Sequence, residues 1–196
     1  MIQVKDVVKS FDGNVVLDHV SADFEDGKVN MIIGQSGSGK TVLMKSMIGL
    51  HAIDSGEILF DTRNGQQNLA GMTEKEVRML HREVGMLFQG AALFDSMTVQ
   101  ENVMFPLEMF SGMEREEMVE RARFCLSRVN MPERAYSLMP SEISGGMQKR
   151  VAIARAIALN PKYLFCDEPN SGLDPKTSLV IDQLIQDITQ EYNICT

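Results

Sequence analysis

Apolar and polar residues alternate along residues 2–8 and 15–24, which is the two-residue period of half-exposed antiparallel strands. Between these segments, Asp12, Gly13 and Asn14 form a typical hairpin turn. A short apolar run at 29–33 predicts a buried strand, and a Gly-rich turn then leads into a helix expected over about 39–50. The first part of the chain is therefore expected to form mainly strands.

The pattern changes to mostly helical along residues 98–160. Before this block, strands are expected at 57–60 and 84–88, separated by a helix that opens with a capping box at Thr73 and Glu76. Within the block, a second capping box at Thr98 and Glu101 opens a helix that Pro106 should kink or end. Two more helices are expected over about 113–129 and 145–159.

A buried strand at 162–166 follows, and then a helix runs from the Asp174 cap to about residue 191. The order of strand, helical block, strand and helix is typical of an α/β fold. We expect a parallel sheet core, an N-terminal antiparallel β subdomain and an inserted helical subdomain. The predicted boundaries are 1–90 and 145–196 for the core with its β subdomain, and about 91–144 for the helical subdomain.

Composition narrows the class of protein. The chain has 196 residues with a net charge of −8, so its surface should not attract nucleic acid, and none is expected as a partner. The longest apolar runs have four residues, whereas a membrane-spanning helix needs about 18. The first residues lack the apolar core of a signal peptide, and the three cysteines lack CxxC spacing. We therefore expect a cytoplasmic protein with reduced thiols.

A complete phosphate-binding loop, G-x-x-x-x-G-K-[ST], lies between the strand predicted at 29–33 and the following helix. Its glycines let backbone N–H groups turn toward phosphate oxygens, and the helix N-terminus adds partial positive charge. Lys40 is expected to hold the β- and γ-phosphates and Thr41 to bind Mg²⁺. The eight residues are Gly34, Gln35, Ser36, Gly37, Ser38, Gly39, Lys40 and Thr41.

Two adjacent carboxylates follow the apolar strand at 162–166. A carboxylate at the carboxyl end of a strand in an α/β sheet lies where ligands bind. We expect Asp167 to bind Mg²⁺, directly or through water, and Glu168 to orient or deprotonate the attacking water.

A second anion site is indicated at Ser144, Gly145 and Gly146, which open the helix predicted at 145–159. Two glycines at a helix start leave N–H groups accessible. The apolar stripe of this helix consists of Met147, Val151, Ala154 and Ala158.

Taken together, these residues resemble the nucleotide-binding subunit of an ABC (ATP-binding cassette) ATPase, a P-loop NTPase, along essentially the whole chain. Residues 34–41 match its Walker A motif, and residues 163–168 match Walker B with the catalytic glutamate. Residues 143–147 match the signature L-S-G-G-Q, with Ile143 for Leu and Met147 for Gln. The resemblance adds Gln89 as the Q-loop glutamine that senses Mg²⁺ and water, Asp174 in the D-loop, and Phe11 as an adenine-stacking aromatic.

The resemblance implies a subunit of a membrane transporter that binds and hydrolyses ATP with Mg²⁺. It implies a head-to-tail homodimer in which the loop at Lys40 of one copy faces the turn at Ser144 of the other. A transmembrane permease subunit is the expected partner, with the chain peripheral on the inner face of the cytoplasmic membrane. An apolar cluster is expected mainly in the core, with one or two members lining a groove for the permease: Leu93, Phe94, Met97, Phe105 and Phe110.

Residues 88–99, 101–103, 105–107 and 139–142, together with Met147, are similar to Mla/Mce-type ATPases that move phospholipids. This similarity favours phospholipid transport, with an Mce-type lipid-binding protein as a further partner. Amino-acid and metal-chelate importers share much of the pattern, so an importer of small molecules is the alternative.

One motif of the family is missing. Its switch histidine lies on a strand after the D-loop helix, but the three histidines here are His19, His51 and His81, all before residue 167. We therefore expect the chain to lack the C-terminal end of the fold and to hydrolyse ATP negligibly by itself.

Two other classes remain open. One is a soluble ABC ATPase of DNA repair, translation or iron–sulfur assembly. The chain has neither the long coiled-coil insertion of DNA-repair members nor the tandem repeat of translation factors. A small-molecule kinase with a phosphate loop would lack the Ser144 turn and the Gln89 context.

Overall fold

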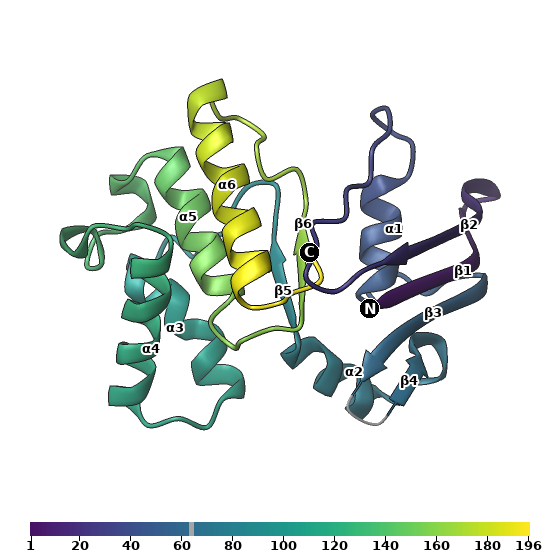
Figure 1. Ribbon diagram of the computed structural model, residues 1–196, viewed down its shortest axis with the longest axis horizontal. Coiled ribbons are helices and arrows are strands. Elements are labelled where there is room, and N and C mark those ends of the chain that lie inside the picture. Colours follow the sequence, from purple (N-terminus) through teal and green to yellow (C-terminus); the bar gives the residue numbers. More distant parts are fainter. Residues whose placement is uncertain (63–64) are drawn as a thin grey trace. The chain divides into compact units, whose positions relative to one another are not determined.

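The computed structural model describes residues 1–62 and 65–196, which divide into two units. The first unit comprises residues 1–81 with 195–196, and the second comprises residues 82–194 (Figure 1). The phosphate loop belongs to the first unit, and the paired carboxylates and the Ser144 turn belong to the second.

An antiparallel four-stranded sheet, in the order β2-β1-β3-β4, forms most of the first unit. The hairpin predicted at residues 12–14 joins β1 to β2, with Phe11 paired to Asn14 at its end. Largest among the buried residues of this sheet are Ile2, Ile58 and Phe60, which point from β1 and β3 into the same core. The strands are β1 (Ile2–Phe11), β2 (Asn14–Phe24), β3 (Ser55–Thr62) and β4 (Gly65–Asn68).

Two helices complete the first unit. Helix α1 (Lys40–Met47) begins directly after the phosphate loop, and its Leu43 and Met47 are buried. Helix α2 (Glu74–Arg82) opens with the predicted capping box, since Glu76 accepts from the Thr73 amide at 2.8 Å. A short 3-10 turn, η1 (Leu69–Gly71), lies between β4 and α2.

The prediction of a strand at residues 29–33 is wrong. These residues are not a strand, and their apolar side chains are exposed, with Met31 76% and Ile33 84% accessible. An apolar run becomes a buried strand only where other strands pair with it along its length. Among the described residues the pairing is short: the Asn30 amide donates to the Thr196 carbonyl at 2.7 Å, and the Thr196 amide donates to Lys28 at 3.1 Å.

Four helices and a two-stranded parallel sheet form the second unit. Strands β5 (Val84–Leu87) and β6 (Tyr163–Cys166) pair with Leu87 opposite Cys166. Gly85 allows this sheet to pack closely, because a Cβ there would lie 2.4 Å from the Ala156 carbonyl oxygen. The helices are α3 (Val99–Phe110), α4 (Arg115–Arg128), α5 (Gly145–Ala156) and α6 (Pro175–Glu191), with 3-10 turns η2 (Glu133–Ala135) and η3 (Pro140–Glu142).

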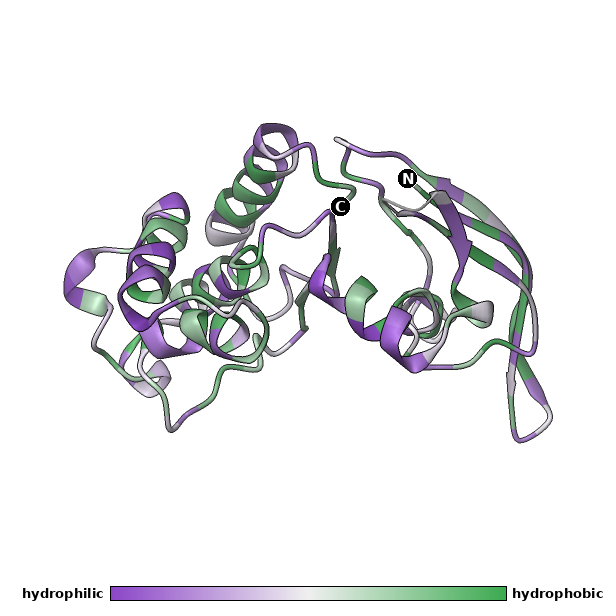
Figure 2. Ribbon diagram, turned by 90° about the horizontal axis from the view of Figure 1, so that it is seen from below, coloured by the Kyte–Doolittle hydropathy of each residue, from purple (hydrophilic) through white to green (hydrophobic). Residues whose placement is uncertain are grey.

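One apolar core joins these helices to β5 and β6, and each helix therefore carries both polar and apolar bands in Figure 2. Pro106 does not end α3, which continues to Phe110. The core includes Val103, Leu107, Leu126, Val151, Ile153, Leu164 and Ile181.

No described helix is long and apolar enough to cross a membrane. Across residues 1–62 and 65–196, no group of three His, Cys, Asp or Glu side chains is placed to bind a metal ion. The three cysteines are free thiols, and burial raises the pKa of Cys125 to about 11.

Candidate functional site

The phosphate loop closes around the ammonium group of Lys40. Because Lys40 is the first residue of α1, its side chain reaches back over the loop, and its Nζ donates to the carbonyls of Gly34 at 2.9 Å and Gln35 at 2.8 Å. The Ser38 amide donates to Gln35 at 3.2 Å and tightens the same turn. The loop thus presents a cation at the N-terminus of a helix, which is a favourable place for phosphate.

Two glycines of the loop have left-handed backbone angles that favour glycine, with φ of +81° at Gly37 and +91° at Gly39. Gly39 is also closely packed, since a Cβ there would lie 3.0 Å from the Val16 carbonyl oxygen on β2. Strand β2 therefore fixes the end of the loop just before Lys40.

Phe11, predicted to stack on adenine, lies at the end of β1 with 39% of its surface exposed. The Lys9 ammonium lies 5.1 Å from its ring centroid, and the His51 ring meets it edge-on at 5.4 Å. Asp54 fixes Lys9 by a 2.9 Å ion pair, and hydrogen bonds from Ser10 and Lys9 lower the pKa of Asp54 to about 2. The ring is thus held in place but remains accessible.

Gln89 and Glu168 meet at the carboxyl edge of the parallel sheet. Leu87 pairs with Cys166, so residues two positions beyond each strand end lie side by side. The Asp167 amide extends the pairing to the Leu87 carbonyl at 2.9 Å, and Gln89 Nε2 donates to Glu168 Oε2 at 2.8 Å. The backbone of Glu168 has φ +46°. Two sequence-predicted residues are therefore in direct contact.

A lysine that the sequence analysis did not single out lies beside this edge. Lys149 on α5 is 4% exposed, and its Nζ donates to the backbone carbonyl of Gln89. Burial lowers the pKa of Lys149, while the negative charges of Asp167 and Glu168 act in the opposite direction. A lysine in an amphipathic helix normally reaches solvent, so sequence alone gave no signal for its burial.

Arg155 is a second residue that sequence reasoning missed. From α5, its Nη1 donates to the Ala92 carbonyl at 2.7 Å and its Nη2 to the Ala91 carbonyl at 2.8 Å. Both alanines have left-handed backbone angles, with φ of +61° and +47°. Helix α5 therefore binds the loop after β5 with two cationic side chains.

The Ser144 turn opens α5 as predicted. Ser144 caps the helix by accepting from the Met147 amide at 3.4 Å. A Cβ on Gly146 would lie 2.7 Å from Thr177 on α6, whereas a Cβ on Gly145 would meet nothing within 4 Å. Gly146 is thus required by the approach of α6, and Gly145 leaves the helix start open.

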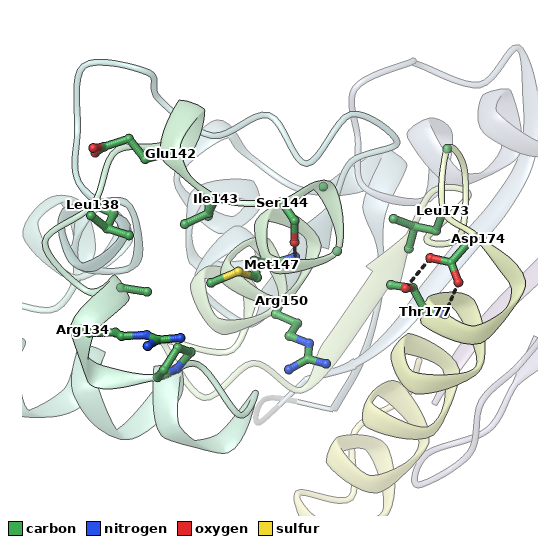
Figure 3. A pocket seen from close by; sticks show the side chains of 15 residues that line it. Arg134, Leu138, Glu142, Ile143, Ser144, Met147, Arg150, Leu173, Asp174 and Thr177 are labelled. Carbon is green, nitrogen blue, oxygen red and sulfur yellow. Dashed lines mark hydrogen bonds between the residues drawn. The ribbon is translucent and has the colours of Figure 1, made fainter.

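A cavity of about 860 Å³ lies in front of this helix start (Figure 3). Ser144, Gly145 and Gly146 line it together with Arg134 and Arg150, which supply positive charge. Asp174 lines the opposite side, and its carboxylate caps α6 by accepting from the Lys176 and Thr177 amides, both at 3.0 Å. The Thr177 hydroxyl also donates to this carboxylate. This hydrogen bond, together with those from the two amides, lowers the pKa of Asp174.

The predicted residues thus fall into three groups. Phe11 and residues 34–41 belong to the first unit. In the second unit, Gln89 and Glu168 are in contact beside Asp167, and Ser144, Gly145, Gly146 and Asp174 line one cavity.

Comparisons with known proteins identify the family and the fold of the chain. The family described as ABC transporter matches residues 17–171. The dimeric structure of MJ0796, a bacterial ABC transporter cassette, superposes with a TM-score of 0.87 at 33% identity, covering 100% of this chain and 85% of that chain. The structure of cbiO1 from Clostridium perfringens, part of the ABC transporter complex cbiONQ, gives a TM-score of 0.87 at 28% identity and covers 98% of this chain and 75% of that chain.

Curated relatives with high similarity include amino-acid transport proteins. The methionine import ATP-binding protein MetN of Clostridium tetani is 39% identical over 194 residues, which are 99% of this chain and 59% of MetN. The glutamine transport ATP-binding protein GlnQ of Escherichia coli is 39% identical over 191 residues, 97% of this chain and 77% of GlnQ. The chain thus spans 59% of the length of its MetN relative.

These relatives bear on the class of transported substrate. The similarity to phospholipid-transport ATPases gains no support from them, because their names refer to methionine and glutamine.

Proposed function

Because the chain belongs to the ABC transporter family and has its P-loop ATPase fold, we propose that it is the ATP-binding and ATP-hydrolysing subunit of a small-molecule importer. The observation that carries this proposal is the phosphate loop, in which Lys40 Nζ lies 2.8–2.9 Å from two loop carbonyls at the start of α1. Amino acids are the proposed class of transported substrate, supported by the names of MetN and GlnQ.

The first unit fits a nucleoside triphosphate. The Lys40 ammonium and the amides at the start of α1 provide positive charge for the β- and γ-phosphates. The tight packing of Gly39 against Val16 fixes where these donors point. The accessible ring of Phe11 offers an apolar face for the base.

In the second unit, Glu168 is the proposed general base for hydrolysis. The amide of Gln89 binds one oxygen of the Glu168 carboxylate and so fixes its orientation, while the other oxygen can accept a proton from the attacking water. Gln89 still has its own side-chain oxygen with which to orient that water. The pair thus positions the nucleophile and accepts its proton.

Mg²⁺ is the proposed metal ion, because it takes oxygen ligands, which hydroxyl, carboxylate and amide side chains supply. Thr41, Asp167 and Gln89 are the proposed ligands. When bound with ATP, Mg²⁺ would neutralise charge on the phosphates.

We further propose that two copies assemble head to tail. Support comes from the cavity at the Ser144 turn, where an open helix start and two arginines offer a second site for phosphate. The solved relative MJ0796 is described as dimeric. ATP bound by the loop of one copy would then be covered by the cavity of the other.

A transmembrane permease is the proposed membrane partner, with this chain on the cytoplasmic side. The aromatic rings of Phe94 and Phe105 contact each other at 4.6 Å between centroids. Phe94 and Phe110 are exposed, whereas Leu93, Met97 and Phe105 are half-buried, so this cluster contributes less to the core than expected. Its exposed rings are suited to contact a helix of the permease.

Replacing Lys40 by alanine tests the proposed nucleotide site. Lys40→Ala should weaken binding of a fluorescent ATP analogue by at least tenfold, or about 1.4 kcal/mol, because the phosphates lose their charged partner. Lys45→Ala, on the same helix, is the matched control and should leave the dissociation constant unchanged. A dissociation constant for Lys40→Ala within about threefold of wild type would refute the phosphate-loop assignment.

A further inference from the structure

Lys149 is an unusual residue for the interior of a helical unit. It is 4% exposed on α5, and its neighbours three and four residues along the same face, Ala152 and Ile153, are buried apolar residues. A buried ammonium is costly unless hydrogen bonds and opposite charge compensate it. A methionine would fill the same space without that cost, so the charge calls for an explanation in terms of its partner.

That partner is the backbone of Gln89. Lys149 Nζ donates to the Gln89 carbonyl, and the Ser171 hydroxyl donates to the same oxygen at 3.3 Å. The other end of Gln89, its side-chain amide, donates to Glu168. Gln89 is therefore held at both ends, by its carbonyl and by its side chain.

Arg155 holds the next part of the same loop. Its guanidinium binds the carbonyls of Ala91 and Ala92, two and three residues after Gln89. The loop at 89–92 is thus bound to α5 through three carbonyl groups. Since α5 begins at the Ser144 turn, only about 8 Å of helix separates that turn from Lys149, at 1.5 Å per residue.

We propose that Lys149 and Arg155 are positioning residues that bind the loop 89–92 to α5, so that the side chain of Gln89 stays in contact with Glu168. The consequence for hydrolysis rests on the proposed function, whereas the contact between Lys149 and Gln89 does not. The proposal links the helix that lines the cavity at Ser144 to the residue that orients the general base.

The contact is tested by following the side-chain amide of Gln89 in nitrogen-15 NMR spectra of the whole chain, with Gln89→Ala to assign its signal. In Lys149→Met, the Gln89 signal should shift or broaden, because its carbonyl loses its charged donor. Lys149→Arg keeps a charged donor and should leave the signal near its wild-type position. Lys75→Met, an exposed change on α2, is the control for loss of a lysine. An unmoved Gln89 signal in folded Lys149→Met overturns the proposal.

The catalytic consequence is measured by ATP hydrolysis with the same variants. Lys149→Met should lower kcat by about ten- to a hundredfold, with KM for ATP within about threefold of wild type. Lys149→Arg should restore most of the rate, which a loss of stability alone would not predict. A rate for Lys149→Met equal to wild type overturns the role in positioning. If the wild-type chain by itself hydrolyses ATP negligibly, as the sequence leads us to expect, the NMR result decides the contact, and the binding of ATP at Lys40 tests the proposed function.

Should Lys149→Met not fold, the wild-type chain and Lys149→Arg provide the decision. A buried, hydrogen-bonded ammonium exchanges its protons slowly, so one lysine Nζ signal should persist at neutral pH in wild type. That signal should be missing from Lys149→Arg. If no lysine signal persists, or if the persisting signal remains in Lys149→Arg, Lys149 does not bind the loop and the proposal is wrong.

Discussion

Two glycines of the phosphate loop share a left-handed backbone but differ in their surroundings. A Cβ on Gly37 would meet nothing within 4 Å, whereas one on Gly39 would lie 3.0 Å from the Val16 carbonyl oxygen and 3.1 Å from Leu17. Gly37 is therefore required by its backbone angle alone, and Gly39 by its backbone angle and by the neighbouring strand. Comparing the two glycines therefore separates the effect of backbone angle from the effect of packing.

Alanine at each position measures this difference. Gly37→Ala should lower the free energy of unfolding by about 1–2 kcal/mol, the cost of a left-handed alanine. Gly39→Ala should lower it by about a further 1–3 kcal/mol, because Val16 and Leu17 must also move. Urea unfolding followed by circular dichroism gives both values. Equal losses for the two variants would contradict the role of β2 in fixing the loop.

At this scale, the structure brings together two residues that the sequence had singled out separately. The contact of Gln89 with Glu168 follows from two parallel strands whose ends are aligned at Leu87 and Cys166. Lys149 and Arg155 were missed, because the partners of both are backbone carbonyls, which every residue carries and which leave no pattern in the sequence.

At the scale of elements, one buried side chain, Asn102, holds the loop that precedes α3. Asn102 is fully buried, and its Nδ2 donates to the carbonyls of Phe94, Met97 and Thr98 at 3.0–3.1 Å. Its Oδ1 accepts from the Phe94 amide at 2.8 Å. A single side-chain amide thus provides hydrogen-bond partners for four backbone groups of the loop that carries Phe94.

Removing this amide should destabilise the second unit. Asn102→Ala leaves buried carbonyls without a donor, so we expect a loss of about 2–3 kcal/mol in the free energy of unfolding. Glu108→Ala, an exposed change on the same helix, should change it by less than about 0.5 kcal/mol. Urea unfolding compares the two variants, and a loss for Asn102→Ala as small as that of Glu108→Ala would refute this account.

Local signals predicted elements well. The hairpin at 12–14 and the capping boxes at Thr73 and Thr98 depend on neighbours within four residues, and all of them form. The strand expected at 29–33 does not form, because a buried parallel strand depends on partners that are distant in sequence. Strand β4 (Gly65–Asn68) was missed, since its residues Gly, Gln and Asn have low strand propensity.

For the whole molecule, the proposed function requires two copies. The phosphate loop lies in the first unit, and the cavity at Ser144 lies in the second. Each copy would contribute one phosphate loop and one cavity, and head-to-tail pairing needs both surfaces on every copy.

Slowing hydrolysis should trap the dimer. Glu168→Gln should reduce any hydrolysis that the chain carries out by about 10²–10⁴-fold, because an amide cannot accept the proton of the attacking water. Light scattering after size exclusion should then show a dimer with ATP and a monomer without it. Adding Ser144→Arg to this variant should abolish the dimer, because the larger side chain fills the cavity entrance, while binding of ATP to the monomer is retained. A dimer that persists with Ser144→Arg would place the second phosphate site elsewhere.

The backbone angles near the Gln89–Glu168 contact have a further consequence. Ala91, Ala92 and Glu168 all have positive φ without being glycine, and such residues store strain of order 1–3 kcal/mol each. That strain persists only while neighbouring groups oppose its release, and the guanidinium of Arg155 is bonded to two of the three residues. The backbone conformation at the sheet edge therefore depends on α5. It is maintained while α5 is packed against the loop, and it relaxes when that helix is displaced.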